Sequence, residues 1–280
     1  MKIIPLESGN FKLDGGAMFG VVPKVIWSKV YPSDENNLCN WAMRCMLVDN
    51  GDSVVLIDAG MGEKQSDKFF GYYYLNGDDS LLGSLRKNGY SVDDITHVIV
   101  SHLHFDHCGG VISRNNREEL VPTFPNAEII VSKKQWLWAT DPNRRERASF
   151  LEENILPMEN SGKLKLIDDE VDILPHIRLL QFDGHSDGQI VPVITSDRGV
   201  VAFAADLLPS TAHIPMPYIM SYDTRPLITL KDKERFYKMA IDGNWVIFLE
   251  HDINNECCTL VEGKKGVEVG IKGKLQDILS

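Results

Sequence analysis

Three histidines and one aspartate lie within six positions of one another in the segment 101–110. This segment reads SHLHFDHCGG, and its ligand-type side chains are those of His102, His104, Asp106 and His107. Imidazole and carboxylate groups are ordinary ligands of zinc and related divalent ions. Because side chains alternate along an extended segment, His102 and His104 project to the same side, where one metal ion can bind both. Asp106 and His107 fall on the turn that follows, which can direct them to a second, adjacent ion.

Three further ligand-type residues, His185, Asp206 and His251, are widely separated along the chain. Taken singly, His185 reads equally as a loop residue, Asp206 as a helix cap or turn residue, and His251 as a partner in a surface salt bridge. Their order behind the histidine-rich segment favours a role in the same metal site.

The elements that must position these residues are predicted from apolar runs and turn signals. Strands are expected at 43–48, 53–58, 95–100, 127–132, 177–182, 190–195, 200–204 and 245–249. Helices are expected at 79–89, from about residue 133, at 144–156 and at 231–242, and residues 9–37 are expected to form a structured loop. The ligand-type residues thus follow the ends of predicted strands, where the sites of sheet-based enzymes commonly form.

The net charge, the cysteine content and the length of the apolar runs limit which binding partners and which cellular compartments can be expected. The 280 residues include 29 Lys and Arg against 40 Asp and Glu, a formal net charge of −11. Such a surface repels a phosphate backbone, so no nucleic-acid partner is expected. Five cysteines without a CxxC pair argue against a disulfide-dense secreted domain. No apolar run approaches the length that spans a bilayer, so we expect a cytoplasmic protein without a membrane partner.

The motif His-x-His-x-Asp-His at 102–107 resembles the signature of the metallo-β-lactamase superfamily. Later landmarks of that family follow in order: Gly184-His185-Ser186, Ala205-Asp206 and Glu250-His251, with Asp58-Ala59-Gly60 earlier in the chain. Residues 13–24 (LDGGAMFGVVPK) resemble the branch of acyl-homoserine-lactone lactonases and organophosphate hydrolases. The resemblance implies one domain over residues 1–280 with an α+β fold, a four-layer αββα sandwich, in which the N-terminal loop 1–40 lines the substrate cleft.

The resemblance also implies a binuclear centre with seven ligands and one supporting carboxylate. The first metal ion would be held by His102, His104 and His185, the second by Asp106, His107 and His251, and Asp206 would bridge both. Asp58 would orient a ligand from outside the first coordination sphere. We expect two divalent ions per chain, zinc in the first place, with manganese or iron as alternatives.

The implied enzyme is a metal-dependent hydrolase in which a metal-bridged hydroxide attacks the carbonyl of a lactone or ester, such as an N-acyl homoserine lactone in quorum quenching. Asp106 and Asp206 are the expected catalytic residues, and the leaving group would take its proton from Asp106, a tyrosine or water. Better-known lactonases have a tyrosine three positions after the bridging aspartate, whereas this chain has Pro209.

The walls of the cleft are expected to be apolar, which suits a small apolar lactone or ester. Candidate substrate contacts are Met18, Phe19, Trp27, His213, Tyr218 and Tyr222. Packing in the core is the alternative role for the aromatic residues. The aromatic cluster 69–74 is interpreted as the entrance of the cleft or as the surface of a homodimer.

Two other functions remain open on the sequence. An aryl ester or phosphotriester hydrolase would use the same ligands, because in-line attack by a bridging hydroxide also suits phosphorus. A non-catalytic metal-binding module belongs to another class, and the complete set of seven ligands argues against it.

Overall fold

The computed structural model describes residues 1–279, which divide into two compact units. Unit 1 consists of residues 1–9, 43–170 and 188–190, and unit 2 consists of residues 10–42, 171–187 and those from 191 onward. Each unit contains one large β-sheet with its own apolar core.

The strands are β1 (Lys2–Asp14), β2 (Leu38–Asp49), β3 (Val54–Ile57), β4 (His97–Ile99), β5 (Ile112–Arg114), β6 (Leu120–Pro122), β7 (Glu128–Ser132), β8 (Leu164–Ile167), β9 (Val171–Leu174), β10 (Ile177–Phe182), β11 (Gln189–Ser196), β12 (Gly199–Phe203), β13 (Val246–Phe248), β14 (Cys257–Gly263) and β15 (Gly266–Gly273). The α-helices are α1 (Gly15–Phe19), α2 (Lys24–Trp27), α3 (Asp67–Gly71), α4 (Leu81–Lys87), α5 (Phe105–Cys108), α6 (Lys133–Thr140), α7 (Glu152–Asn160), α8 (Pro226–Asp242) and α9 (Leu275–Ile278). Short 3-10 helices lie at Val92–Asp94, Gly109–Val111, Arg147–Ser149, Ala205–Leu207 and Thr211–His213.

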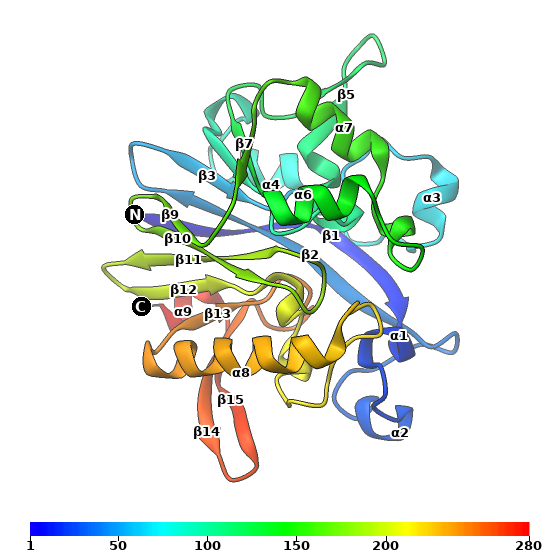
Figure 1. The fold of residues 1–280 in the computed structure, drawn as a ribbon, viewed down its shortest axis with the longest axis vertical. Coiled ribbons are helices and arrows are strands. Elements are labelled where there is room, and N and C mark those ends of the chain that lie inside the picture. Colours follow the sequence, from blue (N-terminus) through cyan, green and yellow to red (C-terminus); the bar gives the residue numbers. More distant parts are fainter. Residues whose placement is uncertain (280) are drawn as a thin grey trace. The chain divides into compact units, whose positions relative to one another are not determined.

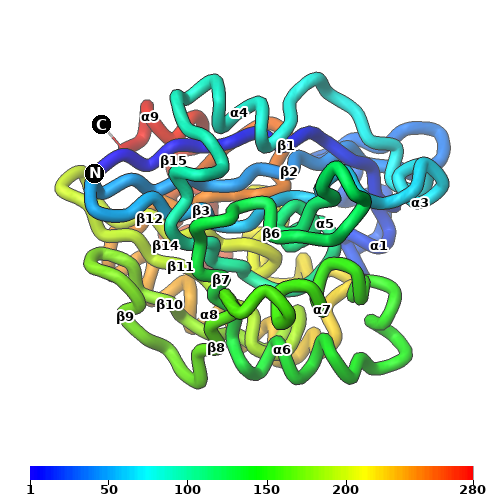
Figure 2. The backbone as a smooth tube through the Cα atoms, turned by 90° about the horizontal axis from the view of Figure 1, so that it is seen from above, coloured from blue at the N-terminus to red at the C-terminus, as the bar shows by residue number. Residues whose placement is uncertain are grey.

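The six-stranded sheet has the order β1-β2-β3-β4-β7-β8, and β1 and β2 run side by side along its edge (Figure 2). β3, β4, β7 and β8 are mutually parallel, whereas β2 pairs with β3 in the antiparallel sense. The parallel strands are short runs rich in Val and Ile, which favour a pleated, buried surface. The core of unit 1 packs α4, α6 and α7 against these strands through buried side chains such as Leu85, Trp136 and Met158.

The seven-stranded sheet of unit 2 has the order β15-β14-β13-β12-β11-β10-β9. β12 and β13 are parallel, and β11 and β14 flank them in the antiparallel sense. The long helix α8 lies along this sheet (Figure 1) and buries Phe236, Tyr237 and Ala240 against strand residues such as Ile247. Helix α8 therefore presents one apolar face to the sheet, as its heptad-like spacing requires.

The strands predicted before the ligand-type residues are confirmed, and so are helices α4 and α6. The expectation of a loop over 9–37, and over most of the N-terminal segment 1–40, holds for 20–23 and 28–37. It is wrong elsewhere, because β1 reaches Asp14 and α1 and α2 follow. Pro5 and Gly9 interrupt the strand pattern of β1, and β1 tolerates the proline because it is the edge strand. The helix expected at 144–156 is also wrong at its start, because α7 begins at Glu152.

All five cysteines are free thiols with buried side chains. Burial raises the pKa of Cys39 to about 11 and the pKa of Cys108 and Cys258 to about 12. These thiols are therefore neutral at physiological pH, which agrees with a structural role for Cys108.

Across the described residues, every helix is too short or too polar to traverse a lipid bilayer.

Candidate metal centre

The first group of ligand-type residues lies at one edge of the unit 1 sheet. β3 and β4 are parallel neighbours in the register Ile57 to Ile99, so their carboxyl ends meet at the same edge. Asp58 follows β3 directly, and the histidine-rich segment begins at His102, three residues after β4 ends. The sheet thus brings together residues that are more than 40 positions apart in the chain.

The buried Asp58 carboxylate accepts three hydrogen bonds that fix its neighbours. The backbone N–H of Ser101 donates to Oδ1 at 2.6 Å, and the Ser101 hydroxyl donates to Oδ2 at 2.5 Å. His107 Nδ1 lies 3.0 Å from Oδ2 and donates its proton there, because a carboxylate can only accept. With the proton on Nδ1, the Nε2 of His107 carries the lone pair, which is the tautomer found in the carboxylate–histidine pairs of metal sites. Asp58 itself has φ 55°, a strained backbone conformation for a residue with a side chain.

His102 and His104 face each other through ring nitrogens that have no proton to share. Ser101 uses its only hydroxyl proton toward Asp58, so its oxygen accepts from His102 Nδ1 at 3.0 Å. Glu146 Oε1 accepts from His104 Nε2 at 2.9 Å. The remaining nitrogens, His102 Nε2 and His104 Nδ1, lie 3.0 Å apart with their lone pairs directed at each other. Two neutral rings in this arrangement repel each other, so the contact is favourable only with a cation or an added proton between them.

Glu146 is held by two further donors. Trp138 Nε1 donates to its Oε2 at 2.6 Å, and Asn143 Nδ2 donates to the same oxygen at 3.1 Å. The side chain is 4% exposed. Glu146 is therefore a buried, oriented carboxylate whose contact with His104 sets the tautomer of that ring.

Asp106 and His107 lie on the short helix α5, and Asp106 Oδ2 lies 3.7 Å from His107 Nε2. The Gly109-Gly110 turn behind them approaches the backbone of the loop after β3 closely. A Cβ on Gly109 would lie 2.1 Å from the carbonyl oxygen of Met61, and one on Gly110 would lie 2.1 Å from that of Ala59. Only glycine fits at these two positions, which anchors the ligand segment to the loop that carries Asp58.

The second group of ligand-type residues lies at one edge of the unit 2 sheet. β12 and β13 are parallel in the register Phe203 to Phe248, so Asp206 and His251, each three residues beyond a strand end, come together. His251 Nε2 lies 3.0 Å from Asp206 Oδ1, and His185 Nε2 lies 3.2 Å from Asp206 Oδ2. All three side chains are buried.

The other ring nitrogens of His185 and His251 are bound to acceptors. His185 Nδ1 lies 2.8 Å from Asp223 Oδ1, and His251 Nδ1 lies 2.7 Å from the carbonyl oxygen of Ala42. A carbonyl only accepts, so the Nδ1 of His251 carries the proton and its Nε2 directs a lone pair at the Asp206 carboxylate. The carboxylate thus faces imidazole nitrogens that bind it only through a cation or an added proton.

Both groups fit divalent metal ions on the chemistry of their donors. Within unit 1 the potential ligand atoms of His102 and His104, and of Asp106 and His107, lie within 4.8 Å of each other, as do those of His185 and Asp206 within unit 2. Neutral imidazoles with an oriented second nitrogen, combined with carboxylates, are the donor set of zinc and related ions. The donor chemistry within each group therefore suits a divalent ion, and the assignment of the seven residues as ligands stays a prediction.

Most of the candidate substrate contacts are buried among one another in unit 2. Met18, Phe19 and Trp27 are at most 1% exposed. The Phe19 ring stacks on Trp27 at 5.0 Å and, on its other face, on His213 at 4.8 Å. Packing explains Met18, Phe19 and Trp27 without a ligand, and their contact with substrate stays a prediction. Tyr218 is half-buried with its ring edge-on to Phe19 at 6.2 Å, and Tyr222 is 38% exposed.

His213 is a neutral histidine with both ring nitrogens engaged. Nε2 lies 2.9 Å from the carbonyl oxygen of Met18, to which it donates, and Nδ1 lies 2.8 Å from the Ser210 hydroxyl, from which it accepts. Burial lowers the pKa of His213 to about 4. Its N–H is thus already used by the protein, and a role of His213, Tyr218 or Tyr222 as donor to a substrate stays a prediction.

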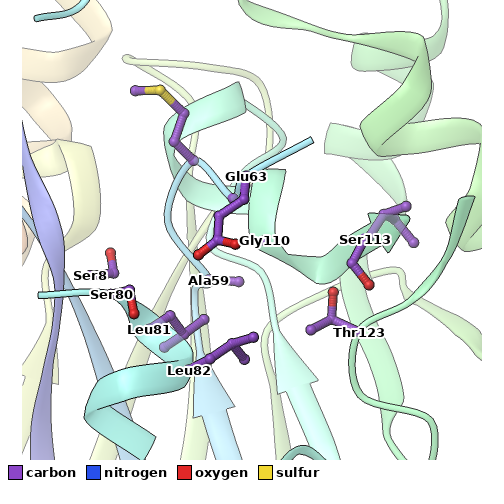
Figure 3. A pocket seen from close by; sticks show the side chains of 12 residues that line it. Ser8, Ala59, Glu63, Ser80, Leu81, Leu82, Gly110, Ser113 and Thr123 are labelled. Carbon is purple, nitrogen blue, oxygen red and sulfur yellow. The ribbon is translucent and has the colours of Figure 1, made fainter. Parts of the chain in front are cut away.

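A cavity of about 90 Å³ lies in unit 1 behind the glycine turn. Figure 3 shows Glu63, Leu81, Leu82 and Thr123 among the side chains that surround it. Sites for small molecules typically measure about 300–1,000 Å³. The cavity is too small for an acylated lactone and contains none of the predicted ligand or substrate residues.

Two carboxylates that orient ligand histidines, Glu146 and Asp223, are absent from the residues predicted from sequence. Each is far from its histidine in the chain, by 42 and 38 positions. Neither belongs to a motif, so only the fold reveals these contacts.

Comparisons with known proteins agree with this donor chemistry. The family model of the metallo-beta-lactamase superfamily matches residues 44–251, a stretch that includes all seven predicted ligands. An N-acyl homoserine lactonase of Bacillus thuringiensis is 28% identical over 232 residues, which cover 78% of this chain and 84% of the relative. A solved structure of a probable metal-dependent hydrolase from Staphylococcus aureus is 29% identical, with a TM-score of 0.88 over 97% of this chain and 96% of the other. AidC, a dizinc quorum-quenching lactonase, shares the fold at 23% identity, with a TM-score of 0.78 over 96% of this chain and 93% of the other.

Proposed function

The chain is a metallo-hydrolase that belongs to the metallo-β-lactamase superfamily and has its α+β fold, and from this premise we propose that it opens the ring of N-acyl homoserine lactones or closely related lactones. The observation that supports this substrate class most strongly is the length of the similarity. Lactonases of Bacillus align with 78% or more of this chain and with 84% or more of their own length.

We propose that the two groups of ligand-type residues together hold two divalent ions, zinc in the first place. The unit 1 group is His102, His104, Asp106 and His107, and the unit 2 group is His185, Asp206 and His251. Support comes from the donor chemistry within each group and from the order of all seven residues inside the matched region. Two such ions supply Lewis acidity toward the substrate oxygen and lower the pKa of a bound water.

The protein residues perform the remaining tasks of the proposed reaction. Asp206 offers one carboxylate oxygen to the side of His185 and the other to the side of His251, which suits a bridging ligand. Asp106 carries the carboxylate that would take up the proton released by the attacking water and pass it to the ring oxygen as the acyl C–O bond of the lactone breaks. Asp58, Glu146 and Asp223 keep the histidines in the tautomer that binds metal.

The donor that stabilises the developing oxyanion is assigned to Tyr218. Pro209 occupies the position where the resemblance expects a tyrosine. Of the three residues considered as substitutes, His213 already donates to Met18 and Tyr222 is 38% exposed, whereas Tyr218 is half-buried within the same segment of unit 2. An apolar acyl group is the substrate element that suits the apolar residues around this tyrosine.

Metal analysis followed by a substrate panel tests the proposal. Purified protein reconstituted with zinc should contain about two metal ions per chain, and the panel should include acyl homoserine lactones, aryl esters and phosphotriesters. We expect lactone opening to be fastest, measured as acid release. A preference for aryl phosphotriesters would assign the chain to the alternative hydrolase, and two bound ions without any turnover would indicate a non-catalytic metal-binding module.

Three expectations from the sequence stay predictions. They are a single domain over residues 1–280, a location in the cytoplasm and the ability to form a homodimer. Sedimentation of the purified protein, with and without substitutions in the aromatic cluster 69–74, tests the last of these.

A further inference from the structure

One face of α8 binds the backbone of a single loop. Lys233 and Tyr237 lie four residues apart on this helix and so project from the same face. Both are buried, with exposed fractions of 1% and 2%. Lys233 Nζ donates to the carbonyl oxygens of His213 at 2.7 Å, Pro215 at 3.0 Å, Tyr218 at 3.2 Å and Met216 at 3.4 Å. The Tyr237 hydroxyl donates to the carbonyl oxygen of Ile214 at 2.5 Å. Two side chains thus bind five of the six carbonyl groups in residues 213–218.

The loop 213–218 depends on these donors for its shape. Its sequence, HIPMPY, contains two prolines, which lack a backbone N–H and prevent a regular helix or strand. Carbonyl groups left without partners in a buried place would be costly, and an ammonium group with three donors satisfies several at once. Lys233 therefore acts on this loop as a built-in hydrogen-bond donor.

Burial of the Lys233 side chain has an energetic cost, which its hydrogen bonds to the loop carbonyls offset. A buried ammonium is unfavourable unless it is fully hydrogen-bonded, and burial lowers the pKa of Lys233 to about 7. Asp223 opposes this shift, and the Tyr237 ring lies 5.8 Å from Nζ. Burial raises the pKa of Tyr237 well above its usual value, so its hydroxyl keeps the proton that it donates.

The loop carries two of the proposed substrate contacts, His213 and Tyr218, and both touch the others. Its first residue, His213, stacks on Phe19 and donates to Met18, and its last, Tyr218, meets the edge of the Phe19 ring. The neighbouring backbone of Ser221 donates to the carbonyl oxygen of Ala17 at 2.7 Å. A change in the loop backbone would therefore move Tyr218 relative to α1.

We propose that Lys233 and Tyr237 are positioning residues that hold the loop 213–218 in the conformation in which Tyr218 meets the substrate. The inference rests on the proposed function only for the role of Tyr218. The hold on the loop is independent of the reaction.

Hydrogen–deuterium exchange of the zinc-loaded enzyme tests the hold on the loop directly. The variants are Lys233→Met and the milder Tyr237→Phe, which removes one hydroxyl and keeps the ring. Lys231→Met is the matched control, because this exposed lysine lies on the same helix. Lys233→Met removes the hydrogen bonds that the lysine donates to the loop, and hydrogen bonds of this kind stabilise local structure. Amides in peptides that cover residues 210–222 should therefore exchange about tenfold faster in Lys233→Met, with a smaller increase in Tyr237→Phe. Unchanged exchange of this peptide in both variants would overturn the proposal.

Steady-state kinetics then separates positioning from general loss of structure. If Lys233 acts through Tyr218, the double variant Lys233→Met/Tyr218→Phe should have nearly the turnover of Tyr218→Phe alone, because the second change removes an interaction already lost. Zinc content should equal that of the wild type. Fully additive losses, or loss of zinc from Lys233→Met, would show that the lysine acts elsewhere, for instance through Asp223 and His185. Wild-type protein that lacks lactonase activity while the exchange result holds would count against the proposed function alone.

Discussion

The two groups of ligand-type residues differ in how the chain assembles them. In unit 1, His102 to His107 form one continuous segment that turns at the end of a single strand. In unit 2, His185, Asp206 and His251 follow three different strands and meet because β12 and β13 are parallel neighbours. A continuous segment keeps its ligands adjacent even when the surrounding sheet is perturbed, whereas the dispersed group exists only when the sheet is complete. We therefore expect the unit 2 group to be the more sensitive to changes in the fold.

The substitution Asp206→Asn should have the largest effect, because it removes the charge that faces both histidines of the unit 2 group. We expect turnover to fall on the order of 10²-fold or more, which exceeds the 10–100-fold losses typical of residues outside the coordination sphere. The measurement is lactone turnover together with zinc content and circular dichroism. Asp187→Asn, a change of an aspartate that pairs with Arg225, is a control. Wild-type turnover in Asp206→Asn would place the bridging ligand elsewhere.

Two substitutions, Asp58→Asn and Asp223→Asn, compare the two groups, because each changes a carboxylate that orients one ligand histidine. Each carboxylate accepts from the Nδ1 of a ligand histidine, and its loss should weaken zinc binding about 10–100-fold. We expect the larger loss for Asp58, because it also binds Ser101 through two hydrogen bonds. Competition with a chromophoric chelator measures both affinities. Equal zinc affinity in the two variants and the wild type would contradict the assigned tautomers.

Glu146→Gln should have a smaller effect, because Gln retains the size of the side chain and an oxygen that accepts from His104. We expect zinc binding to weaken about tenfold, the lower end for such partners. Glu152→Gln, at the exposed start of α7, is a matched control. The same chelator competition applies, and a Glu146→Gln affinity that matches the control would exclude Glu146 from positioning His104.

The smallest effect concerns His213, whose ring nitrogens both bind neutral protein groups, unlike those of the ligand histidines. Its pKa is about 4 in the folded protein and close to 6.5 when unfolded. The unfolded state therefore binds more protons below pH 6.5, and the folded state loses stability as the pH falls from 6.5 toward 4. Between pH 7 and 5.5 this loss is about 1 kcal/mol. Urea unfolding of the metal-free protein should show this loss of stability in the wild type and not in His213→Phe. Parallel profiles of unfolding free energy against pH in the two proteins would contradict the prediction.

Features formed by residues close together in the sequence could be predicted, whereas contacts between residues far apart in the sequence could not. The segment 101–110 could be recognised because its ligands are close in the chain, and the strands before His185, Asp206 and His251 are apolar runs that stand out. β1 was missed because Pro5 and Gly9 break its pattern, which only an edge position in the sheet permits. Glu146 and Asp223 were missed because a single carboxylate has no pattern, and its partner is chosen by tertiary folding.

The buried cysteines can serve as probes of local opening of the enzyme. A thiol reacts with an alkylating reagent as the thiolate, and Cys108 and Cys258, with pKa about 12, are almost never in that form while they are buried. Labelling of either thiol at neutral pH must therefore wait for a transient opening of the surrounding structure. Cys108 follows the last ligand of the unit 1 group, and Cys258 lies on β14 beside β13, which leads to His251. The ratio of the two labelling rates would report which half of the enzyme opens first, and mass spectrometry can follow both in the same sample.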